Sequence, residues 1–288
     1  MVTDSEKDAI QPVILSASRR TDMPRFYLDI LMEQLRKRSF SWHNPYTGQL
    51  RSFSLSPGQQ AVVVLWSKDF GPFLKNKAAF ADWPLFFHFT VNTSDPLLEP
   101  GIPALDERIG QMQVLTKEWG TKAVRWRFDP IAVWRSDTGL KTNIDGLHDI
   151  ADAFHRLGIR DVTVSFMDHY RKIDRRAGAH IPPVEFVYPD HEEQAAMVSD
   201  HFRRLSERGF VIHTCCEPAL AEAGLPGVRP GACIDAELLS EVSGLDLNAI
   251  PDRGQRRSKG CLCHKSIDIG CYTHHRCKAN CLYCYARP

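Results

Sequence analysis

Ala61-Val-Val-Val-Leu-Trp66 is the clearest strand in the sequence, an apolar run with three valines in succession. β-Branched residues favour extended backbone, and a short apolar run of this kind indicates a buried strand. A turn signal, Pro57-Gly58, precedes the run, and the polar residues Ser67-Lys68-Asp69 follow it. The run therefore predicts one buried strand of a sheet whose end carries polar side chains.

Similar runs lie on both sides of this strand and alternate with amphipathic segments. The other predicted strands are Val13–Ser18, Leu85–Val91, Ala123–Phe128, Asp161–Phe166 and Phe210–Thr214. Apolar residues at helical spacing predict helices over Pro24–Lys37, Asp106–Trp119, Asn143–Leu157 and Glu192–Arg208. Repeated strand–helix units build a parallel sheet with right-handed crossovers. Because no dinucleotide-type glycine fingerprint is present, we expect a TIM-like β/α barrel, whether complete, partial or permuted, rather than a doubly wound sheet.

All nine cysteines lie after residue 214. The first dozen residues are polar and do not resemble a signal peptide, and no apolar run approaches the ~18 residues of a membrane span. We therefore expect a cytoplasmic protein without a membrane partner, in which clustered cysteines indicate metal binding or catalysis rather than disulfides. The expected domains are a barrel over residues 1–217 and a Cys-rich iron–sulfur region over 218–288, packed on the barrel mouth.

Three cysteines close the sequence in the spacing C-x3-C-x2-C: Cys277, Cys281 and Cys284. Three thiolates so close together can hold a cuboidal iron–sulfur cluster and leave its fourth iron without a protein ligand. A structural zinc is the alternative, because Cys263, Cys271, His274 or His275 could supply the fourth ligand of a tetrahedral site. A redox-active thiol set is a third interpretation.

Five of the remaining cysteines are candidates for a second metal site: Cys215, Cys216, Cys233, Cys261 and Cys263. Four thiolates would hold either a second iron–sulfur cluster or a zinc ion. Since five candidates compete for four places, at least one of them would be a bystander. Ordinary buried thiols remain the alternative.

Polar residues follow the predicted strands, where a barrel carries its chemistry. Arg19, Arg20 and Asp22 follow the first strand, and Arg127 and Asp129 stand at the end of another. Paired guanidinium groups bind carboxylates and phosphates, so we expect a small anionic substrate. The alternative is a structural ring of ion pairs at the barrel mouth.

The net charge of +1 hides an asymmetry along the chain. From Pro251 to Pro288, eight Lys and Arg face two Asp, so this segment carries +6. Basic residues there would compensate an anionic thiolate cluster. A phosphate-binding strip that contacts nucleic acid is the weaker alternative.

The terminal cysteine motif, with Tyr283 before its last cysteine, resembles the cluster-binding loop of radical S-adenosylmethionine enzymes. The Tyr-Cys-Tyr-Ala-Arg sequence that begins at Tyr283 is most similar to the spore photoproduct lyase-like branch. The resemblance implies a 4Fe-4S cluster, S-adenosylmethionine at its open iron, a 5′-deoxyadenosyl radical, and an electron donor such as a flavodoxin or ferredoxin. The motif normally stands near the amino end of such enzymes, so a permuted barrel is implied, with Ser266–Tyr272 as the strand before the loop.

Several further patches together resemble one uncharacterised bacterial family, a domain of unknown function with radical-SAM-like cysteines. They include Ser16–Asp22, His43–Pro45, Leu65–Asp69, Arg127–Pro130, Cys215–Glu217, Ala232–Asp235, Gln255–Arg256, Cys261–Cys263 and Ser266–Gly270. No counterpart of the glycine-rich segment that holds the methionyl amino group is visible. A second hypothesis therefore stands beside the radical enzyme: a zinc- or iron–sulfur-stabilised binding or redox-sensing protein without radical chemistry.

Overall fold

An eight-stranded parallel sheet forms the centre of the computed structural model, which describes residues 11–17, 19–44, 47–137 and 139–286. The strand order is β12-β11-β9-β6-β5-β4-β1-β13. The strands are β1 (Val13–Ala17), β4 (Ala61–Ser67), β5 (Leu85–Thr90), β6 (Val124–Ile131), β9 (Asp161–Phe166), β11 (Val211–Thr214), β12 (Val228–Pro230) and β13 (Ile267–Asp268). All six strands predicted before residue 215 are confirmed, although Ser18 lies outside the described residues.

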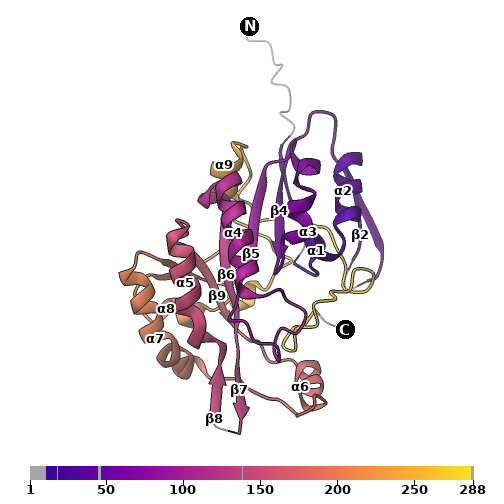
Figure 1. Cartoon of the computed structure of the whole chain (residues 1–288). Coiled ribbons are helices and arrows are strands. Elements are labelled where there is room, and N and C mark those ends of the chain that lie inside the picture. Colours follow the sequence, from indigo (N-terminus) through magenta and orange to yellow (C-terminus); the bar gives the residue numbers. More distant parts are fainter. Residues whose placement is uncertain (1–10, 18, 45–46, 138, 287–288) are drawn as a thin grey trace.

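Helices connect most of these strands (Figure 1). They are α1 (Met23–Phe26), α2 (Leu28–Lys37), α3 (Gly71–Lys75), α4 (Leu105–Trp119), α5 (Leu147–Arg156), α6 (Arg171–Gly178), α7 (His191–Glu207), α8 (Pro218–Glu222) and α9 (Ala236–Ser243). The helix predicted over Pro24–Lys37 is divided at Tyr27, whose φ of −137° is not helical. Asp22 caps α1 by accepting a hydrogen bond from the Arg25 amide.

The sheet is open, so the structure shows a mixed α/β fold rather than the expected closed barrel. Within the described part of the chain, β12 and β13 are the two edges and do not pair with each other. From β1 to β12 the strands follow one another in chain order, and β13 returns to pair with β1, Leu15 opposite Ile267. Residues after 217 therefore supply both edge strands of the sheet.

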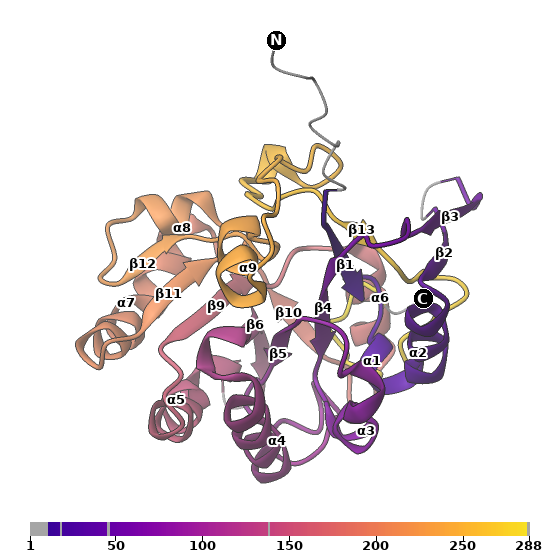
Figure 2. The same cartoon turned by 90° about the horizontal axis from the view of Figure 1, so that it is seen from above.

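The two faces of the curved sheet bury different partners (Figure 2). Side chains such as Val63, Leu65 and Phe87 point to the outer face and pack against the helices. Their neighbours Val62 and Val64 point to the inner face, which packs against Cys-rich segments and α9. The barrel does not close because these segments, instead of further strands, cover the inner face.

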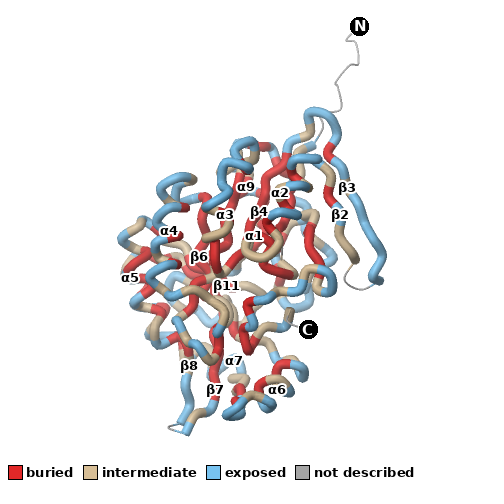
Figure 3. Tube along the Cα trace, turned by 45° about the vertical axis from the view of Figure 1, so that its right-hand side comes forward, coloured by how far each residue is buried: buried red, intermediate tan, exposed pale blue. Residues whose placement is uncertain are grey.

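Two smaller sheets lie outside this core. A hairpin joins β2 (Ser39–His43) to β3 (Leu50–Ser54), and an antiparallel sheet joins β7 (Val133–Ser136), β8 (Gly139–Thr142) and β10 (Glu185–Val187). The sequence does not predict this hairpin, and its residues show only turn signals and aromatic side chains. Most residues of β3 are exposed and therefore lack the apolar run of a buried strand (Figure 3). Among the described helices, none is long and apolar enough to cross a membrane.

Candidate metal centres

The predicted site residues gather at the carboxyl edge of the sheet. All eight strands are parallel, so the segments that follow them lie at the same edge. In Figure 1 the yellow C-terminal segment runs past the lower end of β4. The segments at this edge include Arg19–Asp22 after β1, Lys68–Asp69 after β4, Cys215–Cys216 after β11 and the stretch after β13.

The five candidate cysteines of the second site converge and form one contiguous group, here the five-cysteine set. The sulfurs of Cys233 and Cys215 lie 3.4 Å apart, within hydrogen-bond distance of each other. Cys215 also interacts with Cys216, Cys216 with Cys261, Cys261 with Cys263, and Cys263 with Cys233. The set is a ring of neighbouring thiols from three separate chain segments.

Arg127 supplies positive charge to this ring. Its Nη1 lies 2.8 Å from the sulfur of Cys233, and the side chain is buried against the ring of Trp66. Contacts with the thiols of Cys215 and Cys263, together with the Arg127 guanidinium, lower the pKa of Cys233 well below its ordinary value. Cys233 is therefore the member of the set that most readily becomes a thiolate, the form that binds metal.

His88 lies behind the same set and is a neutral core histidine. Its Nε2 is 2.7 Å from the carbonyl oxygen of Cys233, and its ring stacks on Trp66. Burial, followed by the charge of Arg127, lowers the pKa of His88 to about 3. A neutral ring that contacts a carbonyl must carry its proton on Nε2. Its Nδ1 is buried and has no hydrogen-bond partner among the described residues.

Cys277, Cys281 and Cys284, here the terminal triad, lie close enough for their thiols to interact electrostatically. Cys281 is buried, whereas the other two are half-buried. Burial raises the pKa of Cys277 to about 11 and that of Cys281 further above its ordinary value. These thiols therefore stay protonated at neutral pH until a metal displaces their protons.

Backbone hydrogen bonds hold the segment that carries the terminal triad. The Leu282 amide donates to the Leu98 carbonyl, with the two atoms 2.8 Å apart. Arg176 of α6 donates to the carbonyl oxygens of Leu282 and Cys284, each at 2.7 Å. Because these partners come from separate parts of the fold, the position of the triad depends on the whole carboxyl edge.

A buried ionic network lies beneath the triad. Lys68 Nζ is 2.8 Å from Glu99, which also accepts hydrogen bonds from Asn92 and from the hydroxyl of Tyr283. Burial alone would raise the pKa of Glu99, but Lys68 and these hydrogen bonds hold it below its ordinary value. The Glu99 carboxylate in turn keeps Lys68 protonated, and Cys281 would add to this effect once it is a thiolate. Sequence reasoning missed Glu99, because it stands in a stretch without regular structure.

Charged side chains connect the two cysteine sites. Arg127 contacts Cys233 and also forms an ion pair with Asp129. Asp129 interacts with Lys68, and Lys68 interacts with Cys281 of the terminal triad. Arg127 and Asp129, predicted to bind substrate, therefore lie between the two sets of thiols.

Arg19 and Arg20 pair with β13. Asp268 lies 3.6 Å from Arg19 and 3.4 Å from Arg20, and Arg20 also donates to the Gly270 carbonyl. Asp252 pairs with Arg19 at 3.6 Å. The two arginines thus tie the last strand and the segment before it to β1. This resembles the structural ion-pair alternative, but with acidic partners that the sequence does not predict.

Asp22, predicted to belong with Arg19 and Arg20, faces the terminal triad. It accepts hydrogen bonds from the Ser67 hydroxyl at 2.7 Å and from the Lys68 amide at 3.2 Å. Burial raises the pKa of Asp22 to about 6, and its charge is felt by Cys277. This carboxyl group can therefore hold or release a proton near neutral pH beside the triad.

A family model described as "Domain of unknown function (DUF1848)" matches residues 14–286, which include the sheet and both cysteine sites. The chain belongs to the DUF1848 family. This confirms the predicted membership of an uncharacterised family. No curated protein matches the sequence. Since the family description assigns no reaction, the function of this DUF1848 chain has to be argued from its site.

The cysteine outside both sites, Cys271, lies elsewhere in the DUF1848 chain. Its sulfur is near His274 and His43, the latter at the end of β2. Cys263, another candidate fourth ligand for a zinc at the triad, belongs to the five-cysteine set.

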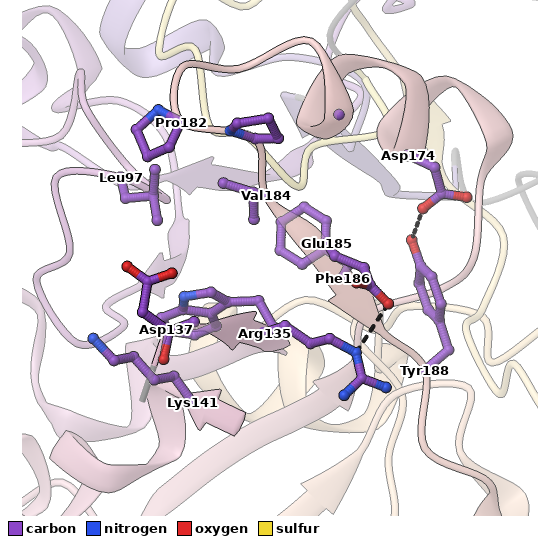
Figure 4. A pocket seen from close by; sticks show the side chains of 14 residues that line it. Leu97, Arg135, Asp137, Lys141, Asp174, Pro182, Val184, Glu185, Phe186 and Tyr188 are labelled. Carbon is purple, nitrogen blue, oxygen red and sulfur yellow. Dashed lines mark hydrogen bonds and ion pairs between the residues drawn. The ribbon is translucent and has the colours of Figure 1, made fainter. Parts of the chain in front are cut away.

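The DUF1848 chain also has a cavity of about 720 Å³ beside the three-stranded sheet (Figure 4). Trp134, Val184 and Phe186 contribute its apolar wall. No cysteine is among its lining residues, so this cavity is separate from the metal centres.

Proposed function

We propose that this DUF1848 chain is an iron–sulfur enzyme of the radical S-adenosylmethionine type that acts on an anionic substrate. One observation carries the proposal. Three thiols in C-x3-C-x2-C spacing lie together at the carboxyl edge of a parallel sheet, in the segment that directly follows the edge strand β13. The cluster and the substrate of such an enzyme must share one edge of the sheet, because a radical cannot cross the protein.

The terminal triad suits a cluster with one open iron, since Cys277, Cys281 and Cys284 offer three thiol ligands. When bound, such a cluster would supply the electron and the coordination site for cleaving S-adenosylmethionine. The chain itself would contribute Lys68, which counters the negative charge of thiolates, and Glu99, which holds Lys68 in place.

The strand order supports the permuted, partial barrel. Counted from β13, the neighbours run β13-β1-β4-β5-β6-β9-β11-β12. Every strand then lies beside its successor, as in a barrel that opens with the strand bearing the cluster loop. Moving β13 and its loop to the other end of the chain would leave this arrangement unchanged.

Unpaired donors support an anionic ligand beside the triad. Arg25 Nη1 and the Thr21 hydroxyl are buried and lack a hydrogen-bond partner among the described residues. Leaving buried donors unpaired costs about 1–3 kcal/mol each, so a carboxylate or phosphate that filled this position would be stabilised. Asp22, which lies between these two residues in sequence, would exchange a proton with such a ligand.

The five-cysteine set has two candidate occupants. The distance between the sulfurs of Cys233 and Cys215 is 3.4 Å. This is closer to the ~3.8 Å between two thiolates on one tetrahedral zinc than to the roughly 6 Å between thiolates on a cubane cluster. This spacing favours a second function: a zinc-stabilised binding or redox-sensing protein without radical chemistry. In the enzyme, the same set would hold a second cluster that relays electrons from a flavodoxin or ferredoxin.

Metal and sulfide analysis of anaerobically purified protein separates these functions. The enzyme requires iron and labile sulfide, and Cys281→Ala should remove about four iron atoms while Lys278→Ala, in the same loop, retains them. Reduced protein should then release 5′-deoxyadenosine from S-adenosylmethionine, and Cys281→Ala should abolish the release. Zinc without sulfide would overturn the enzyme and support the second function.

A further inference from the structure

A third group of metal-binding side chains lies apart from the five-cysteine set and the terminal triad. His43 stands at the end of β2, while Cys271 and His274 belong to the segment after β13. One ligand atom from each of the three residues lies within 4.8 Å of the other two. Residues far apart in the chain are thus brought together in a group that includes no member of the five-cysteine set or the terminal triad.

One donor-to-donor distance in this group is that expected around a tetrahedral ion. The sulfur of Cys271 is 3.5 Å from Nδ1 of His274, and the rings of His43 and His274 stack with centroids 3.8 Å apart. Around a tetrahedral zinc, with Zn–S of ~2.3 Å and Zn–N of ~2.0 Å, sulfur and nitrogen are ~3.5 Å apart. Cys271 and His274 therefore already stand at this spacing, whereas the ring of His43, which stacks on His274, must turn to point a nitrogen at the same ion.

The donor types select the ion. A thiolate with two imidazoles suits zinc and similar transition metals, whereas magnesium and calcium prefer oxygen ligands. Cys271 is buried and His274 is exposed, so the group is closed on one side and open to solvent on the other. Such an arrangement leaves a fourth coordination position for water.

We propose that His43, Cys271 and His274 bind one zinc ion, which cross-links the β2–β3 hairpin to the segment that carries the terminal triad. The hairpin otherwise lies at the surface, and β3 is largely exposed. A metal bond at His43 would hold the end of this hairpin against the segment between β13 and Cys277. The inference does not rest on the proposed enzyme, because it concerns different ligands.

Zinc counting in whole protein tests this site. His274→Asn and His43→Asn should each lower the zinc content by about one ion per chain, with iron and sulfide unchanged. The control His191→Asn changes an exposed histidine at the start of α7 and should keep the zinc. Protein purified without zinc is first incubated with excess zinc, so that the five-cysteine set and the terminal triad cannot capture all of it, and is then desalted.

The outcomes separate this site from the proposed function. Loss of one zinc in both variants, but not in the control, supports the site whether or not iron is present. Equal zinc in wild type and His274→Asn, or no uptake by wild type, overturns it. Since His274 is exposed, its substitution should leave the fold intact, which a matching circular dichroism spectrum would verify.

Discussion

Arg127 is the residue on which the two cysteine sites most depend. One end of its guanidinium donates to Cys233 and another pairs with Asp129, whose carboxylate also accepts from the Ser165 hydroxyl at 2.5 Å. Because Arg127 is buried, its charge is poorly screened and needs both partners. It is therefore better described as a support of the thiols than as the free substrate-binding group that the sequence suggests.

Replacing Arg127 by glutamine should weaken metal binding at the five-cysteine set by about 10–100-fold, the usual effect of removing a group that orients a ligand. Arg127→Lys should weaken it less, because the charge is retained. Competition with a chelator measures the affinity. The control Arg135→Gln breaks an exposed pair with Glu185 on the smaller sheet and should have no effect. Unchanged metal affinity in Arg127→Gln would contradict the prediction and leave the Arg127–Cys233 contact a packing role alone.

His88 should make stability depend on pH. Its folded pKa, about 3, lies below the ordinary 6.5, so the unfolded chain binds the extra proton first. Stability is therefore fully present above pH 6.5 and is lost as the pH falls towards 3. Relative to His88→Gln, the wild type should lose about 2 kcal/mol between pH 6.5 and 5.

Urea unfolding at several pH values measures this difference, with all samples carrying the same metal. His88→Gln keeps an amide that can donate to the Cys233 carbonyl but does not titrate. The control His191→Gln should follow the wild-type profile. Parallel profiles for wild type and His88→Gln would contradict the prediction.

At the scale of elements, the triad segment packs tightly against the loop between β5 and α4. A Cβ on Gly101 would lie 2.5 Å from the carbonyl oxygen of Ala279, closer than real Cβ atoms approach backbone. Gly101 therefore permits the close contact between these two loops. Gly110, on α4, has no atom within 4 Å of such a Cβ.

Gly101→Ala should displace the triad segment, destabilise the fold by about 1–3 kcal/mol and lower the iron bound by the triad. Gly110→Ala should instead stabilise the protein by about 0.5–1 kcal/mol, because alanine is the better helix former. Thermal unfolding and iron content measure both effects. Full iron content and wild-type stability in Gly101→Ala would be inconsistent with this packing.

Helices and strands were predicted correctly where burial selects a pattern of apolar residues. Strands such as β4 and β9 were predicted because both their faces are buried, which excludes polar residues. β3 and β12 were missed, since their residues are largely exposed. β2 was missed although Phe40 and Trp42 alternate with polar residues. Tyr27 interrupts the predicted first helix without any glycine or proline to announce it.

At the scale of the molecule, parallel topology made the gathering of polar strand ends predictable. The approach of Cys215 to Cys233 follows from it too, because they follow neighbouring strands, whereas Cys261 and Cys263 precede β13 and their position does not follow from it. The partners of Arg19 and the position of Glu99 were not predictable, since they depend on loops and on β13, whose pairing with β1 the sequence does not encode locally. The open sheet was not predicted, because no sequence pattern indicates that α9 covers its inner face.

Metal removal should loosen residues 244–286 most. From residue 244 to 286 the structure has little besides the short strand β13, so bound metal would supply much of its order. In stripped protein, trypsin should first cut after Arg253, Arg257 and Lys259. Lys37, exposed at the end of α2, should be cut at an unchanged rate. Mass spectrometry of the fragments measures this, and equal cleavage with and without metal would refute it.

The return of β13 to the side of β1 also sets the order of events during synthesis. Ribosomes release the amino end first, and parts of a protein fold as they emerge. Seven strands, from β1 to β12, can emerge before β13 is made, so the outer edge of β1 waits unpaired on the nascent chain. A ribosome stalled before Cys261 would hold a nearly finished sheet with a bare edge and neither set of thiols complete. Any metal that these thiols bind would therefore be loaded after seven of the eight strands had been made.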